Sequence, residues 1–274
     1  MLKKFKAAKI IRDKKITAYS LSSEEKEELL SVARMTLCTQ QREIDPVTYA
    51  QTGELELFNM GRGIDIALFP MTPERRLSLE SYIGYVAFKN RIPIAYGGGW
   101  IFLFNSKIGT NIFPALRSGE SAYVFCQILR LYHHHFSVKR FIVEPYQIGK
   151  DNTEGLKSGA YWFYYRLGFR SVKKELRELA HEEFHRISNE KKYRAPLTVM
   201  KQLATSNLEL NLAPNENLPE QNPERISELI TNFVNTKHEG NRKHIDAQKL
   251  FGWKKGMTER EFILTTQMNS EILK

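Results

Sequence analysis

The sequence predicts a mixed α/β (α+β) fold, in which a mixed central sheet is flanked by helices and followed by a helical C-terminal extension. Three observations support this prediction. Between residues 22 and 176, segments rich in β-branched and aromatic residues alternate with segments of helical periodicity. The 274 residues include 42% hydrophobic and 26% charged residues, which is typical of a globular protein. After residue 176 the chain becomes strongly charged, with amphipathic helical patterns.

The first predicted elements are a helix and three strands, at residues 22–41, 63–71, 81–89 and 92–104. The helix is favoured because Ser22 and Ser23 can cap it and acidic residues fill its first turn. Asn90 and Arg91 form a connection of hairpin length between the second and third strands.

Three consecutive glycines, Gly97 to Gly99, lie inside the third strand. Glycine weakens the interior of a strand because it has no side chain to pack. The run therefore predicts a β-bulge, or a close approach by a ligand or by another backbone.

The next predicted elements are a helix, a strand, a second helix and a short strand, at residues 118–136, 139–145, 152–167 and from 169 onward. Gly168 suits the C-terminal end of the second helix. The order strand, hairpin, helix, strand, helix, strand is typical of a mixed α/β domain.

These patterns divide the chain into a basic N-terminal arm, a central domain and a helical extension, at residues 1–21, 22–176 and 177–274. A charged helix is expected at 173–191. A polar linker rich in Pro and Asn lies near 211–223. Amphipathic helices are expected at 224–235 and 259–273, and these could form a homodimer.

The formal net charge of +10 leaves two function classes open, binding of nucleic acid and binding of an acidic ligand. The first fifteen residues hold seven basic residues and one acidic residue, a net charge of +6. We find no zinc finger, RNA-binding aromatic signature or helix-turn-helix pattern, which disfavours nucleic acid as the partner.

Two cysteines, Cys38 and Cys126, cannot form a disulfide framework or a four-cysteine zinc site, so a reducing compartment is expected. No apolar run reaches the roughly 18 residues of a membrane span. The basic start lacks the long apolar region of a signal peptide. We therefore expect a cytoplasmic protein.

The first motif with chemical meaning is F-P-A-L-R-S-G-E-S-A at residues 113–122, which joins a strand to a helix. The start of a helix leaves backbone N–H groups unpaired and carries partial positive charge. Gly119 would let a phosphate approach the backbone, and Arg117 adds a fixed cation. The turn therefore suits a pyrophosphate, although the same pattern also occurs in ordinary helix caps.

The second motif is A-Y-W-F-Y-Y-R-L-G-F at residues 160–169, at the end of a predicted helix. An aromatic stripe at helical spacing is most often core. A phenol with a pKa near 10 can also protonate a leaving thiolate, so Tyr164 is a candidate general acid and Tyr165 is its alternative.

Together the two motifs resemble those of the GNAT superfamily of acyl-CoA-dependent N-acyltransferases, over residues 22–174 in element order. The resemblance implies a GNAT-like sheet and an acyl-CoA co-substrate, in the first place acetyl-CoA. It implies that an amine attacks the thioester directly. The acceptor amine is not identified by the sequence.

The resemblance also implies roles for individual residues. Tyr164, four residues before Gly168, would protonate the CoA thiolate, and Glu144 or Glu80 would help to deprotonate the amine. Residues expected to contact the cofactor are Arg117, Ser118, Gly119, Glu120 and Ser121 at the pyrophosphate, Gly98 and Gly99 at the pantetheine, and Lys157 at a phosphate.

Two histidine patterns suggest a metal but fit it poorly. His181 and His185 belong to an H-E-x-x-H sequence whose flanks are strongly polar, which favours a solvated helix face. His133, His134 and His135 are consecutive, so in a helix they point in different directions. We expect no metal site.

The sequence therefore favours an N-acyltransferase. A non-catalytic CoA-binding or interaction protein is the first alternative, and a basic nucleic-acid-binding protein is the second.

Overall fold

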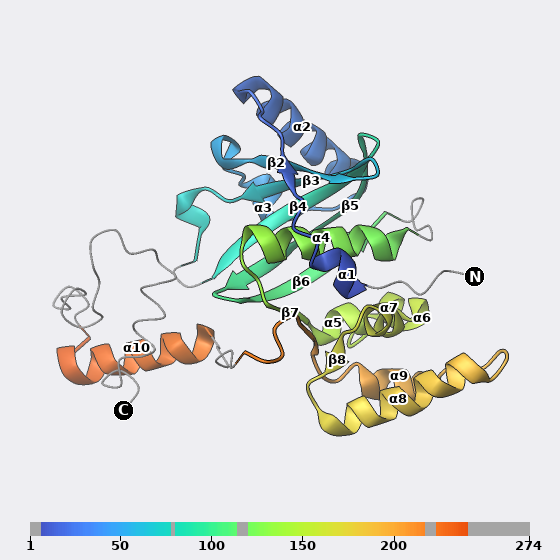
Figure 1. Ribbon diagram of the computed structural model, residues 1–274. Coiled ribbons are helices and arrows are strands. Elements are labelled where there is room, and N and C mark those ends of the chain that lie inside the picture. The colour runs from blue at the N-terminus through green and yellow to red at the C-terminus, as the bar shows by residue number, and fades with distance from the viewer. Residues whose placement is uncertain (1–6, 78–79, 114–119, 217–222, 241–274) are drawn as a thin grey trace. The chain divides into compact units, whose positions relative to one another are not determined.

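The computed structural model describes residues 7–77, 80–113, 120–216 and 223–240 (Figure 1). The helices are α1 (Ala7–Ile11), α2 (Ser23–Thr39), α3 (Asp45–Thr48), α4 (Ser121–His135), α5 (Pro145–Ile148), α6 (Thr153–Ser158), α7 (Ala160–Arg166), α8 (Lys174–Asn189), α9 (Leu197–Leu203) and α10 (Pro223–His238). The strands are β1 (Thr17–Ala18), β2 (Glu56–Gly61), β3 (Ile64–Pro70), β4 (Ser81–Lys89), β5 (Ile92–Phe102), β6 (Asn105–Ile112), β7 (Arg140–Val143), β8 (Arg170–Ser171) and β9 (Leu208–Asn211). Short 3-10 turns, η1 (Thr52–Glu54) and η2 (Pro73–Arg75), flank β2 and β4.

The strands form one mixed sheet in the order β1-β2-β3-β4-β5-β6-β7-β9-β8. Neighbouring strands from β1 to β6 are antiparallel, β6 and β7 are parallel, and β9 pairs antiparallel with both β7 and β8. Helices pack on the sheet, so the predicted mixed α/β class is confirmed (Figure 1).

Each face of the sheet carries its own apolar core, because successive strand residues point to opposite faces. On β3, Ile66 and Leu68 belong to the core that includes α1, α4 and α7. Ala67 and Phe69 belong to the core that includes α2 and α3. We call these two sides the α4 face and the α2 face.

The glycine run of β5 does not form the predicted bulge. Gly97, Gly98 and Gly99 pair in regular register with β4 and β6, and the irregularity between β4 and β5 falls at Ala87 and Phe88. The other predicted possibility, a close approach by another backbone, holds at Gly97, where a Cβ atom would lie 2.4 Å from the carbonyl oxygen of Gly109. Gly98 and Gly99 make room for aromatic rings. A Cβ atom on Gly98 would lie 2.5 Å from the Tyr82 ring, and one on Gly99 would lie 2.6 Å from the Tyr132 ring.

The helix predicted at 152–167 is two helices, α6 and α7, separated by Gly159. The φ angle of Gly159 is +69°, a left-handed conformation that ends α6 and that glycine adopts at little cost. The break redirects the chain, so α7 presents its aromatic residues to the core on the α4 face.

Part of the predicted basic arm belongs to the fold. Helix α1 packs on α4, and β1 pairs with β2 at the edge of the sheet. The buried guanidinium of Arg130 donates hydrogen bonds to the carbonyl oxygens of Asp13 and Lys15. Residues 1–6, which hold Lys3, Lys4 and Lys6, lie outside the described residues.

The sheet also uses chain beyond residue 176, since β9 lies between β7 and β8. The chain separates into two compact units, 1–217 and 218–274, and this division falls inside the predicted linker at 211–223. In the second unit, α10 contains the helix expected at 224–235. The helix expected at 259–273 lies outside the described residues. No helix in the described part of the chain has the length and apolar character to cross a membrane.

Candidate functional site

The candidate site forms where the only parallel strand pair of the described sheet comes apart. Strands β6 and β7 pair through Asn105, Ser106 and Lys107. Beyond these residues β6 continues to Ile112, whereas β7 ends at Val143. Pro145 then begins α5, and proline suits the first position of a helix and does not extend a strand.

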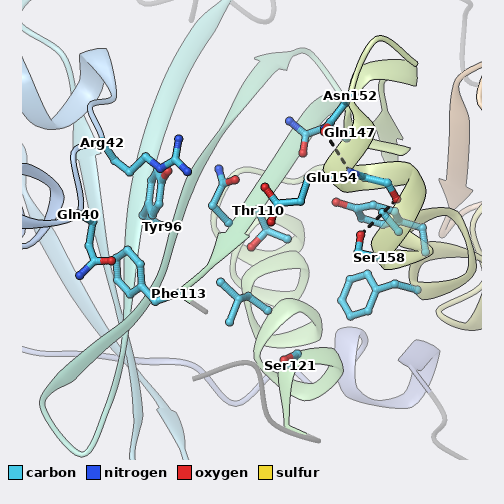
Figure 2. Close-up of a pocket in the computed structure, with 16 residues that line it drawn as sticks. Gln40, Arg42, Tyr96, Thr110, Phe113, Ser121, Gln147, Asn152, Glu154 and Ser158 are labelled. Atoms are coloured by element: carbon cyan, nitrogen blue, oxygen red, sulfur yellow. Dashed lines mark hydrogen bonds between the residues drawn. The ribbon is translucent and has the colours of Figure 1, made fainter. Parts of the chain in front are cut away.

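A cleft of about 490 Å³ lies along the free end of β6 (Figure 2). It is lined by Gln40, Arg42, Tyr96, Thr110, Asn111, Ile112, Phe113, Ser121, Gln147, Asn152, Glu154, Gly155, Ser158, Ala160, Phe163 and Tyr164. These residues come from the end of α2, from β5 and β6, from the start of α4 and from α5 to α7.

The cleft reaches both faces of the sheet, as strand alternation along β6 shows. Ile112 packs with the core of the α4 face, where Phe163 and Tyr164 also lie. Phe113 and Tyr96 belong to the core of the α2 face, and their rings stack at 5.5 Å. We call these two sides the inner half and the outer half of the cleft.

Tyr164 lies in the inner half and is 3% exposed. The rings of Phe125, Phe163 and Phe169 surround it, with centroids 5.2 to 5.6 Å away. Burial raises the pKa of Tyr164 above its ordinary value, because an ionised phenol would lose its hydration. The hydroxyl therefore stays protonated and keeps its hydrogen-bond donor.

The start of α4 lies beside the inner half, with Ser121 as its first residue and as part of the lining. Glu120 precedes it and gives no side-chain cap to the helix. Its carboxylate contacts Arg62 at 3.0 Å and Lys89 at 3.2 Å. Two cations thus offset the negative charge next to the proposed phosphate turn. Arg117, Ser118 and Gly119 lie outside the described residues.

Glu144 lies in a smaller cavity next to the cleft, with a volume of about 150 Å³. Asn111 and Gln147 line both cavities, so they form a shared wall. The Glu144 carboxylate is about half exposed and lies 3.7 Å from the ammonium of Lys107. Gly98 also lines this cavity.

The other predicted residues lie outside the cleft lining. Glu80 immediately precedes β4, at the end of that strand remote from the cleft, since Ser81 pairs with Ile101. Gly99 faces Tyr132 in the core on the α4 face. Lys157 is exposed on α6, next to the lining residue Ser158.

Several lining residues carry no motif in the sequence. Asn152 accepts a hydrogen bond from the Gly155 amide at 3.0 Å and so caps α6, which explains its presence at the edge of the cleft. Gln147 lies against Gly109, where a Cβ atom would approach its side chain to 3.0 Å. Arg42 follows α2 in a polar stretch that gives no functional signal.

Comparison with known proteins identified no similar protein. No family model, curated protein or solved structure matches this chain. The site therefore rests on its geometry and on the two sequence motifs.

The side chains of the H-E-x-x-H segment on α8 make contacts within the fold. Glu183 is buried, where it accepts a hydrogen bond from the Tyr193 hydroxyl at 2.6 Å and contacts Arg186 at 3.3 Å. His185 is exposed and contacts Asn189. Across the described residues, no group of three or more metal-binding side chains comes together.

The histidine run at the end of α4 also has structural contacts. His133 contacts the carbonyl oxygen of Val138, and His134 contacts that of Ile11. His135 pairs with Glu56 at 2.9 Å. The three rings thus contact different parts of the fold.

Proposed function

We propose that this protein is an acyl-CoA-dependent N-acyltransferase of the GNAT type, with acetyl-CoA as the first donor to test. The observation that supports the proposal is the cleft that passes through the sheet beyond the β6–β7 pairing. A donor and an acceptor can enter such a cleft from opposite faces and meet at the edge of β6.

The inner half offers what a CoA thioester needs. The start of α4 carries the partial positive charge of a helix N-terminus, which favours a pyrophosphate nearby. Within the described part of the chain, the stretch of β6 beyond Lys107 has no strand partner on its β7 side. The two amide groups of pantetheine can pair with that free edge as a short strand would.

In the proposed reaction the amine nitrogen attacks the thioester carbonyl carbon and forms a C–N bond. The C–S bond then breaks and leaves the CoA thiolate. Tyr164 donates its O–H hydrogen to this sulfur. Because burial raises its pKa, Tyr164 stabilises the thiolate mainly by this hydrogen bond, and a proton that transfers to the sulfur is returned to the phenolate from solvent.

The amine must lose a proton during the attack. Glu144 lies in the adjoining cavity behind the wall formed by Asn111 and Gln147. The proposed route is therefore a water molecule that passes the proton from the amine to Glu144. We assign no role to Glu80, which is remote from the cleft.

Calorimetric titration with CoA and acetyl-CoA tests the proposal directly. We expect CoA and acetyl-CoA to bind at micromolar concentrations. If neither binds at millimolar concentration, the proposal is wrong. Binding without release of CoA thiol in the presence of amines would instead identify a non-catalytic CoA-binding protein. The proposal also places the protein in the cytoplasm, where an exposed free thiol such as Cys38 is stable.

Tyr164→Phe separates catalysis from packing. The phenylalanine ring keeps the contacts with Phe125, Phe163 and Phe169, so stability and CoA affinity should change little. Loss of the donor should lower turnover by about 10²-fold or more. Equal losses in affinity and turnover would make Tyr164 a packing residue.

A further inference from the structure

The outer half of the cleft contains a cation that has no hydrogen-bond or ion-pair partner for its side chain within the described part of the chain. Arg42 lines the cleft next to Tyr96, and its side chain forms no hydrogen bond or ion pair with another described residue. In Figure 2 its guanidinium lies beside the Tyr96 side chain. An unpaired guanidinium in a cleft is a site for an anionic group.

The position of Arg42 is fixed by the way in which α2 ends. Gln41 has a positive φ of 52°, its amide donates to the carbonyl oxygen of Cys38, and the Arg42 amide donates to that of Leu37. This pair of hydrogen bonds is a Schellman motif, which holds the backbone of the residue after the helix. The guanidinium therefore extends from an ordered backbone.

The surroundings of Arg42 suit a small polar molecule. Gln40 and Asn111 provide amide groups, and the stacked rings of Tyr96 and Phe113 provide an apolar surface. Among the described lining residues, Glu154 is the one carboxylate. It belongs to α6 on the opposite wall of the cleft (Figure 2).

Arg42 is placed for the acceptor and away from the donor. Its neighbours Tyr96 and Phe113 belong to the α2 face, whereas Ser121 at the start of α4 and Tyr164 lie on the α4 face. A pyrophosphate bound at the start of α4 would lie on the inner side of β6. Arg42 would meet whatever enters from the outer side.

We propose that the acyl acceptor is an amine that also carries a carboxylate, and that Arg42 binds this carboxylate. This inference rests on the proposed function. A guanidinium can form two parallel N–H···O bonds with a carboxylate, which orients the ligand as well as binding it. With the carboxylate held at Arg42, the amine can point along the cleft to the edge of β6, where the thioester would lie.

The test compares each amino acid with the amine that lacks its carboxylate. The pairs are L-leucine with isopentylamine, L-phenylalanine with phenethylamine, and L-lysine with cadaverine. Ligand-observed NMR titrations measure their binding to the full chain, with and without CoA. At least one amino acid should bind about tenfold or more tightly than its partner amine, and Arg42→Gln should remove this preference.

Two further variants make the result specific. Arg42→Lys keeps the charge and should keep part of the preference. Arg75→Gln removes the same charge from η2, outside the cleft, and should behave as the wild type. Equal binding of both members of every pair, no binding of any amino acid, or an unchanged preference in Arg42→Gln would overturn the inference.

Calorimetry with CoA keeps the two proposals distinguishable. Arg42→Gln should leave CoA affinity unchanged, and a loss of CoA affinity in this variant would assign Arg42 to the donor and overturn the inference. If the wild type does not bind CoA, the proposed transfer reaction fails. The titrations without CoA still show whether the outer half binds a carboxylate.

Discussion

Replacing Gly98 with alanine should destabilise the fold through a clash with Tyr82. The added Cβ atom would lie 2.5 Å from Cε2 and 2.9 Å from Cζ of that ring. Carbon atoms in contact are normally about 3.5–4.0 Å apart, so the ring would have to move by roughly 1 Å. Tyr82 stacks on Trp100 with centroids 4.4 Å apart, which resists the movement. Overpacking of this kind costs about 1–3 kcal/mol.

Urea unfolding measures this loss, and the chain offers a matched control. No described residue comes within 4 Å of a Cβ atom added to Gly53, so Gly53→Ala should be neutral or slightly stabilising. Gly97→Ala should destabilise the fold more than Gly98→Ala, because its Cβ atom would lie 2.4 Å from the carbonyl oxygen of Gly109 in the neighbouring strand. A backbone oxygen in a sheet cannot swing aside as a ring can.

A double variant shows whether the clash is the cause. Removing the ring with Tyr82→Ala should relieve the extra cost of Gly98→Ala, so the two changes should be non-additive. If Gly98→Ala unfolds at the wild-type urea concentration, or if the double variant shows simple additivity, the glycine is not there to accommodate the ring.

Three other predictions follow from burial, charge and topology. Cys38 is exposed, whereas burial raises the pKa of the Cys126 thiol to about 12. A thiol reagent at pH 8 should therefore label Cys38 quickly and Cys126 only when the protein unfolds. Rapid labelling of both thiols would contradict this. Burial, and then the charge of the nearby His133, lower the pKa of His134 in the folded protein. As the pH falls, the His134 ring therefore binds a proton more readily in the unfolded chain than in the folded one. The stability of the fold should decrease as the pH drops through about 6.5 and below. Urea midpoints at pH 7.5 and 5.5 should therefore differ less in His134→Gln, and an unchanged difference would remove this role. A chain ending at residue 217 keeps β9 and should show cooperative thermal unfolding by circular dichroism. A chain ending at residue 206 lacks β9, the strand between β7 and β8, and should not unfold cooperatively. Similar unfolding of both chains would count against the sheet order.

The sequence predicted the elements that carry strong local signals. Helix α2 begins where Ser22 and Glu25 form a capping box, and the turn at Asn90 and Arg91 has the two positive φ angles that a tight hairpin needs. The predicted general acid, Tyr164, lies in the cleft together with Ser121. Such features depend on residues close together in the chain.

The features that the sequence did not predict depend on long-range contacts. The sequence pattern did not define the ends of strand β6, because this strand has polar residues on both faces, namely Asn105, Ser106, Lys107 and Asn111. This polarity reflects the cleft and the neighbouring strands, which the local sequence does not show. Gly97 to Gly99 suggested a bulge or a close approach by another group, but not which group. The groups that require these glycines come from other elements, namely the Gly109 carbonyl oxygen of β6 and aromatic rings of β4 and α4. Local pattern alone cannot show which distant side chain fills a gap.

The basic character of the chain is also better understood from the structure. Arg130 is buried and directs its hydrogen bonds to backbone carbonyl oxygens of the N-terminal segment, and Arg12 donates to the carbonyl oxygen of Leu212. Arg62 and Lys89 offset the charge of Glu120. These cations are engaged within the protein, so a basic balance is not by itself a reason to expect nucleic acid. Arg42 differs because it lines the candidate cleft and has no hydrogen-bond or ion-pair partner for its side chain among the described residues, which is why we assign it a functional role.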